Sequence, residues 1–261
     1  MNVDELVKPY ETLQVSWDHG VLQVTLNAPK TRNALSSRML AELADVLAGV
    51  EAAAPGVRAV VITGADPAFC SGMDLRERTG GQVAAGHPLM HLVHAMRQLP
   101  APMVARVNGA ARAGGIVLAV ACDIAIADAS ATFSMTETRL GLTPEMTLAT
   151  ITGEVAPWLL RRYALTAEVF DAAQAERMGL LSQVSEPGEL DAAVGGVLDA
   201  LRSCSPVALA ATKRRLADRA SFADLDTLLA AADASTATFA TDEAQAGIAA
   251  ARARQPAPWA L

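Results

Sequence analysis

The chain has 261 residues, 52% of them hydrophobic and 4% aromatic, with a formal net charge of −7. A chain of this length can bury a core large enough to be stable without a disulfide or a structural metal. The acidic balance, with no block of like charges, argues against nucleic acid and anionic membrane surfaces as partners. Three widely separated cysteines, Cys70, Cys122 and Cys204, have no CxxC spacing and indicate reduced thiols.

The N-terminal residues do not combine a basic start with an apolar run, as a signal peptide does. The most apolar run, residues 113–122, is about half as long as the roughly 20 residues that cross a bilayer. We therefore expect a cytoplasmic protein with no membrane partner.

Alternating apolar residues predict a hairpin of strands 13–17 and 21–26, joined by a turn at residues 18–20. Ser36 or Ser37 then caps a helix that extends to about Ala54. Apolar strands at residues 58–63, 102–107 and 123–127 alternate with helical stretches, which predicts an α/β (α+β) fold with buried, mainly parallel strands.

From about residue 185 onward every segment is predicted to be helical, at residues 189–201, 206–217, 222–239 and 242–254. We divide the chain into a core, residues 1–195, and a C-terminal helical region, residues 196–261. The alanine-rich helices have modest apolar stripes, so we expect this region to pack on another subunit.

Two glycine-containing segments follow predicted strands, the position at which ligands bind in sheets of this kind. In the first, Gly72 lets the backbone amide of Met73 point into a cleft. In the second, Gly114 and Gly115 place free amides at the positive end of a helix. Two such loops can form an oxyanion hole, or they can simply be tight turns. Neither contains the GxGxxG pattern of dinucleotide sites.

Histidines occur at positions 87, 91 and 94, on one face of a helix predicted at residues 88–99. This spacing can bind a metal, but no carboxylate or cysteine joins the group, so we interpret it as the helix's polar face and expect no metal site. Cys70 and Ser71 have no His and Asp pair to activate them and are not expected to be nucleophiles.

These segments resemble the signature regions of the crotonase superfamily, the enoyl-CoA hydratase/isomerase family, over nearly the whole chain. The matching segments are residues 27–35, 68–75, 108–115, 121–125, 133–144 and 241–248. The resemblance implies a ββα spiral with a helical C-terminal trimerisation region, assembled as a homotrimer or a dimer of trimers. It also implies an acyl-CoA thioester substrate, with coenzyme A as part of the substrate and no permanently bound cofactor.

The resemblance assigns the oxyanion donors to the backbone amides of Met73 and Gly114, and the catalytic acid/base to Glu137. A carboxylate in an apolar surround has a raised pKa and exchanges protons near neutrality. Glu145 matches a second acidic position of some members. The CoA moiety is expected to contact Arg32, Ala34, Leu35, Ser71, Asp74, Leu75 and Arg76, with Asp74 fixing its loop by hydrogen bonds.

The chain departs from the best-known hydratases at Val117, where they carry their other catalytic glutamate. The favoured reaction is the hydration of a 2-enoyl-CoA to a 3-hydroxyacyl-CoA. Double-bond isomerisation and C–C hydrolysis of a β-dicarbonyl acyl-CoA are alternatives, as is a non-catalytic acyl-CoA-binding subunit. The acyl chain itself cannot be predicted from these residues.

Overall fold

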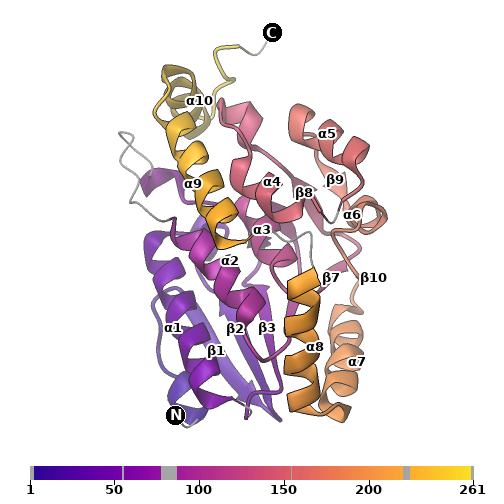
Figure 1. Cartoon of the computed structure of the whole chain (residues 1–261). Coiled ribbons are helices and arrows are strands. Elements are labelled where there is room, and N and C mark those ends of the chain that lie inside the picture. Colours follow the sequence, from indigo (N-terminus) through magenta and orange to yellow (C-terminus); the bar gives the residue numbers. More distant parts are fainter. Residues whose placement is uncertain (1–2, 55, 78–86, 154, 220–223, 260–261) are drawn as a thin grey trace.

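The computed structural model describes residues 3–54, 56–77, 87–153, 155–219 and 224–259. Its main sheet has six strands in the order β1-β2-β3-β5-β7-β10 (Figure 1). The first two form the predicted antiparallel hairpin, and the others are parallel to β2, as the apolar runs predicted. The strand bounds are β1 Leu13–Asp18, β2 Val21–Leu26, β3 Ala59–Gly64, β5 Met103–Val107, β7 Ile124–Asp128 and β10 Gln183–Ser185.

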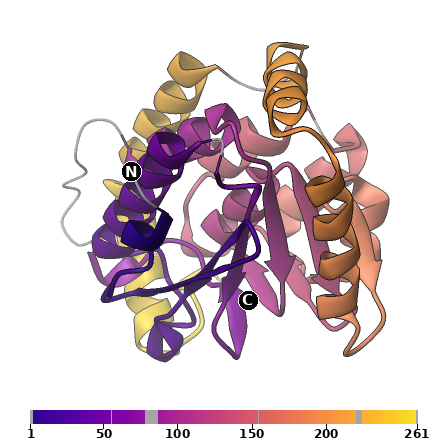
Figure 2. The same ribbon diagram turned by 90° about the horizontal axis from the view of Figure 1, so that it is seen from below.

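Both faces of this sheet are buried, which explains why β3 is apolar at consecutive positions. One face, which includes Val60 and Ile62, contributes to the main core with helices α1 (Ser37–Ala53), α2 (Pro88–Gln98) and α3 (Gly114–Val120). The alternate residues, such as Ala59 and Val61, pack against helix α7 (Leu190–Ser203). Figure 2 shows the strands between these two groups of helices.

A second, four-stranded sheet of two- and three-residue strands has the order β4-β6-β8-β9. Its bounds are β4 Ala68–Cys70, β6 Ala110–Arg112, β8 Thr132–Ser134 and β9 Phe170–Asp171. β4, β6 and β8 each follow a strand of the main sheet and precede a helical segment, which makes the repeated ββα unit of the predicted spiral. The sequence predicts loops at β4 and β6, because three residues are too few to show a periodic pattern.

The predicted C-terminal helices are present as α7, α8 (Pro206–Arg219), α9 (Leu225–Phe239) and α10 (Asp242–Arg252). The boundary that we placed after residue 195 lies within α7. Helix α9 packs on α2 and α4 (Glu145–Ile151), as Figure 1 shows. Helix α10 packs on the 3-10 helix η4 (Glu137–Leu140). The C-terminal region therefore lies against the segment that carries Glu137.

The remaining elements are the 3-10 helices η1 (Val3–Leu6), η2 (Pro29–Thr31) and η3 (Leu75–Glu77), and the helices α5 (Pro157–Thr166) and α6 (Ala172–Met178). No single helix among the described residues is long and apolar enough to cross a membrane. Helix α7 and residues 206–217 of α8 meet that test only as a pair, bent by 109° at their junction.

Candidate active site

The Met73 amide is oriented by a parallel bridge between Met73 and Leu35. The Leu35 amide donates to the Gly72 carbonyl at 2.8 Å, and the Asp74 amide donates to the Leu35 carbonyl at 3.2 Å. In this parallel bridge Leu35 bonds to the carbonyl before Met73 and to the amide after it. The N–H of Met73 itself therefore points to the opposite side. The Met73 amide is therefore directed away from Leu35, and Met73 lines a pocket.

The Gly114 amide lies at the start of α3, where backbone N–H groups precede the first intrahelical bonds. The first of those bonds run from Ile116 and Val117 to the Ala113 carbonyl. Ala113 itself has φ 45°, in the left-handed region that is costly for a residue with a side chain. The backbone thus turns sharply just before the predicted donor.

The two loops touch at Gly72, which has φ +88°. A Cβ atom there would lie 2.9 Å from the Arg112 carbonyl oxygen and 3.4 Å from the Gly114 nitrogen. Only glycine accommodates both this conformation and this approach. Because Met73 directly follows Gly72, the contact brings the Met73 and Gly114 amides to the same pocket wall, as an oxyanion hole requires.

The pocket has a volume of about 70 Å³ and is bordered by both predicted oxyanion residues and both predicted carboxylates. Segments far apart in sequence meet in it, namely the loop after β4, the start of α3, η4, α4 and α9. Ser235 and Phe239 reach it from α9, a contribution that the sequence did not indicate. The lining residues are Ser71, Met73, Leu75, Ala113, Gly114, Val117, Thr136, Glu137, Leu140, Leu142, Thr143, Pro144, Glu145, Met146, Thr147, Ser235 and Phe239.

The Glu137 carboxylate has two different oxygens. Oε1 accepts a hydrogen bond of 2.7 Å from the Thr147 hydroxyl. Oε2 is buried and has no hydrogen-bond partner within the described residues. Desolvation by burial raises the pKa of Glu137, and the Thr147 hydrogen bond partly opposes that rise. A carboxyl group with a raised pKa and an unengaged oxygen is suited to proton transfer at neutral pH.

Glu145 also lines the pocket, at the first position of α4 after Pro144, where the helix dipole favours a negative charge. Val117 borders the same space from α3 and is fully buried. The described pocket wall therefore has one buried carboxylate, a second carboxylate at a helix start, and an apolar side chain where the best-known hydratases carry a glutamate.

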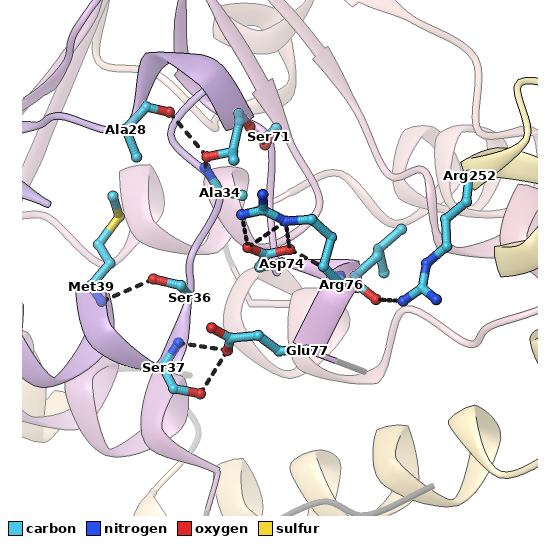
Figure 3. Close-up of polar contacts among 12 residues, drawn as sticks. Ala28, Ala34, Ser36, Ser37, Met39, Ser71, Asp74, Arg76, Glu77 and Arg252 are labelled. Carbon is cyan, nitrogen blue, oxygen red and sulfur yellow. Dashed lines mark hydrogen bonds and ion pairs between the residues drawn. The ribbon is translucent and has the colours of Figure 1, made fainter. Parts of the chain in front are cut away.

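Figure 3 shows four of the residues expected to hold the CoA moiety, namely Ala34 in the turn before α1 and Ser71, Asp74 and Arg76 in the oxyanion loop. Asp74 is 5% exposed and accepts hydrogen bonds from the Arg76 backbone amide at 2.9 Å and from its guanidinium at 2.5–3.1 Å, so its carboxylate is engaged within its own loop. Arg76 lowers the pKa of Asp74. Arg252 of α10 donates to the Leu75 carbonyl, so α10 is tied to the same loop.

The neighbouring turn at residues 32–35 is held by Asn33, which has φ 57° and is fully buried. Its side-chain amide donates to the Ala65 and Ala68 carbonyls at 2.7 Å, and its Oδ1 accepts from the Ala28 amide. Arg32 beside it is exposed, whereas Ala34 and Leu35 are buried. Ser71 donates to the Thr31 carbonyl at 2.9 Å, which ties this turn to the oxyanion loop.

The histidines do not form the single polar face that we predicted. His87 is 3% exposed and caps the start of α2, with Nδ1 accepting from the Leu89 amide, whereas His91 is exposed. No group of three metal-ligating side chains occurs in the described part of the chain. Cys70 and Cys122 are buried, and burial raises the pKa of the Cys70 thiol to about 12, as expected for a structural rather than a nucleophilic residue.

The fold is a ββα spiral, and its pocket is lined by two strand-to-helix loops and two carboxylates. Among solved structures, an enoyl-CoA hydratase from Mycobacterium avium subsp. paratuberculosis K-10 superimposes with a TM-score of 0.84 at 30% identity. It matches 97% of this chain and 100% of its own. A polyketide biosynthesis enoyl-CoA hydratase from Bacillus subtilis gives 0.86 at 25% identity, over 95% and 99% of the two chains.

The family model for enoyl-CoA hydratase/isomerase matches residues 16–260. The crotonyl-CoA hydratase of Syntrophomonas wolfei is 31% identical over 92% of this chain and 94% of its own. The short-chain-enoyl-CoA hydratase of Clostridium acetobutylicum is 33% identical over 80% of this chain and 82% of its own. The chain belongs to the enoyl-CoA hydratase/isomerase family, and the predicted resemblance is confirmed.

Proposed function

We propose that the protein hydrates a 2-enoyl-CoA to the 3-hydroxyacyl-CoA. This proposal depends on Glu137, which borders the same pocket as Met73 and Gly114 and whose buried Oε2 has no hydrogen-bond partner among the described residues. The hydratases among the relatives at 31–33% identity support it.

In the proposed reaction, Glu137 Oε2 takes a proton from water while the water oxygen bonds to C3 of the substrate. The C2–C3 π electrons move through C1 to the thioester oxygen, which becomes an enolate oxygen between the two amides. Oε2 then returns the proton to C2 and the thioester carbonyl re-forms. Each oxyanion donor contributes about 10²–10³ to the rate of such a step.

Isomerisation of the double bond is the second candidate, and Val117 is the observation that favours it. With an apolar side chain at this position, no second carboxylate on α3 orients a water molecule. Moving a double bond from C3–C4 to C2–C3 requires only the transfer of one proton from C2 to C4, and a single carboxylate oxygen can perform it.

Both reactions are tested with purified protein, 2-butenoyl-CoA and 3-butenoyl-CoA in D2O. Hydration is followed by loss of the conjugated thioester absorbance, with one deuterium incorporated at C2. Isomerisation produces that absorbance from 3-butenoyl-CoA, and direct transfer of the C2 proton to C4 leaves less than one deuterium at C4. Glu137→Gln should lower the rate by about 10²–10⁴. Rates in the variant equal to wild type would contradict the assigned acid/base.

We also propose that the CoA moiety of the substrate binds along Arg32 and Arg76. We propose further that the protein associates into homotrimers or dimers of trimers. The exposed apolar side chains of Trp158 and Leu165 on α5, 67% and 76% accessible in the single chain, support self-association. Analytical ultracentrifugation tests this assembly, and a monomer at micromolar concentration would contradict it.

A further inference from the structure

Thr147 is a buried hydroxyl beside Glu137, and the reaction proposed above assigns it no role. It lies on α4, ten residues after Glu137 and across the turn at Gly141, and is 1% exposed. Its hydroxyl oxygen is 2.7 Å from Glu137 Oε1, within the usual range for a hydroxyl that donates to a carboxylate. Both residues line the pocket.

This contact makes the two oxygens of Glu137 unequal. Oε1 accepts a hydrogen bond from the Thr147 hydroxyl. When Glu137 is protonated, the carboxyl proton therefore resides on Oε2. Oε2 is buried and has no hydrogen-bond partner within the described residues, so no hydrogen bond from them competes with proton exchange at this oxygen.

We propose that Thr147 is a positioning residue whose hydroxyl holds Glu137 so that Oε2 carries the proton to and from the substrate. The proposal rests on the acid/base role of Glu137 in the function proposed above. It adds a specific device to that role, namely a threonine on the following helix that selects the reacting oxygen.

The same hydrogen bond affects the ionisation of Glu137. Burial raises the pKa of this carboxyl group and the Thr147 bond lowers it, so removing the bond raises it further. No charged neighbour contributes a resolved shift. The charged side chains on η4 and on the elements packed around it are Arg139, Glu145, Arg161, Arg162, Asp242, Glu243 and Arg252.

The test compares Thr147→Val, which keeps the branched shape but removes the hydroxyl, with Thr147→Ser, which keeps the hydroxyl. Thr147→Val should lower kcat/KM about tenfold at neutral pH and move the acidic limb of the pH profile to higher pH. Thr147→Ser should retain the wild-type limb. Thr147→Ala repeats the comparison with a side chain too small to clash.

Thr150→Val is the matched control, because it removes another buried threonine hydroxyl from the same helix. That hydroxyl donates to the Met146 carbonyl at 2.8 Å rather than to Glu137. Thr150→Val should therefore leave the position of the acidic limb unchanged. A merely structural role for Thr147 predicts equal effects of the two valine variants.

The ionisation of Glu137 is also read without turnover, from the infrared carboxyl band that disappears in Glu137→Gln. Titration should give a higher midpoint in Thr147→Val than in wild type or Thr147→Ser. The proposal would be overturned if Thr147→Val left both the titration midpoint and the acidic limb of the pH profile unchanged. It would also be overturned if Thr147→Ser shifted them as much as Thr147→Val does. If the wild type hydrates no enoyl-CoA, the proposed function fails, but this titration still decides the contact between Thr147 and Glu137.

Discussion

Substitution of Gly72 by alanine tests whether the two backbone amides act together. Alanine at φ +88° costs about 1–2 kcal/mol of folding free energy. Its Cβ would also lie 2.9 Å from the Arg112 carbonyl oxygen, so the loop before Gly114 has to move. Displacing one oxyanion donor should lower kcat by about 10²–10³. Steady-state hydration kinetics and urea unfolding measure the two effects separately.

Gly188→Ala provides the matched control for this experiment. Gly188 has a similar φ of +81°, but a Cβ atom there would meet nothing within 4 Å. It should show a similar loss of stability and a wild-type kcat. If Gly72→Ala loses stability and keeps its kcat, the amides of Met73 and Gly114 do not stabilise the enolate, and the oxyanion assignment is refuted.

Three further predictions concern titration and stereochemistry. Burial raises the pKa of Glu137, so the folded state keeps the Glu137 proton at pH values above the ordinary carboxyl pKa. The free energy of unfolding therefore falls as the pH rises from the ordinary carboxyl pKa to the raised one. Glu137→Gln should therefore melt about 2–4 °C above wild type near pH 9, as a gain of about 1 kcal/mol implies, with a smaller difference near pH 4. The pKa of Asp74 is lowered, chiefly by Arg76, so its contribution is present above the ordinary carboxyl pKa and lost as pH falls through the lowered value. Asp74→Asn should cost about 1 kcal/mol near pH 7 and less near pH 3, and an equal cost at both pH values in thermal melts would contradict the ion pair. Because one oxygen serves both proton transfers, deuterium and hydroxyl should add to the same face of the double bond, and anti addition observed by NMR would argue against a single proton carrier.

The sequence predicted the parts of the fold that rest on long apolar patterns. Strand β3 has four consecutive apolar residues, 59–62, and α1 has a capping serine and a helical stripe, so both were recognisable. The strands of the second sheet were missed, because β4 and β6 have three residues each and are defined by pairing with distant strands.

The site was predictable to the extent that it depends on glycine and on the family resemblance. Gly72 has the positive φ that the prediction required, and Glu137 is partly buried, as an acid/base with a raised pKa requires. Thr147 was not predicted, because its partner lies across a turn and only the packing of α4 against α9 brings it into the pocket. Nor did the histidine spacing reveal that His87 would fold inward as a helix cap.

Val117 and Thr147 together explain how one carboxylate can serve the site. A glutamate at position 117 would face the same pocket as Glu137, and two like charges in a desolvated space raise the pKa of one of them. Valine removes that interaction, so the ionisation of Glu137 is governed by burial and by one hydroxyl. In the proposed mechanism the two amides stabilise the enolate in hydration and in isomerisation alike, and Glu137 Oε2 carries the proton in both. The carbons that exchange a proton then depend on where Oε2 is held, which we propose is set by the hydrogen bond from Thr147 to Oε1.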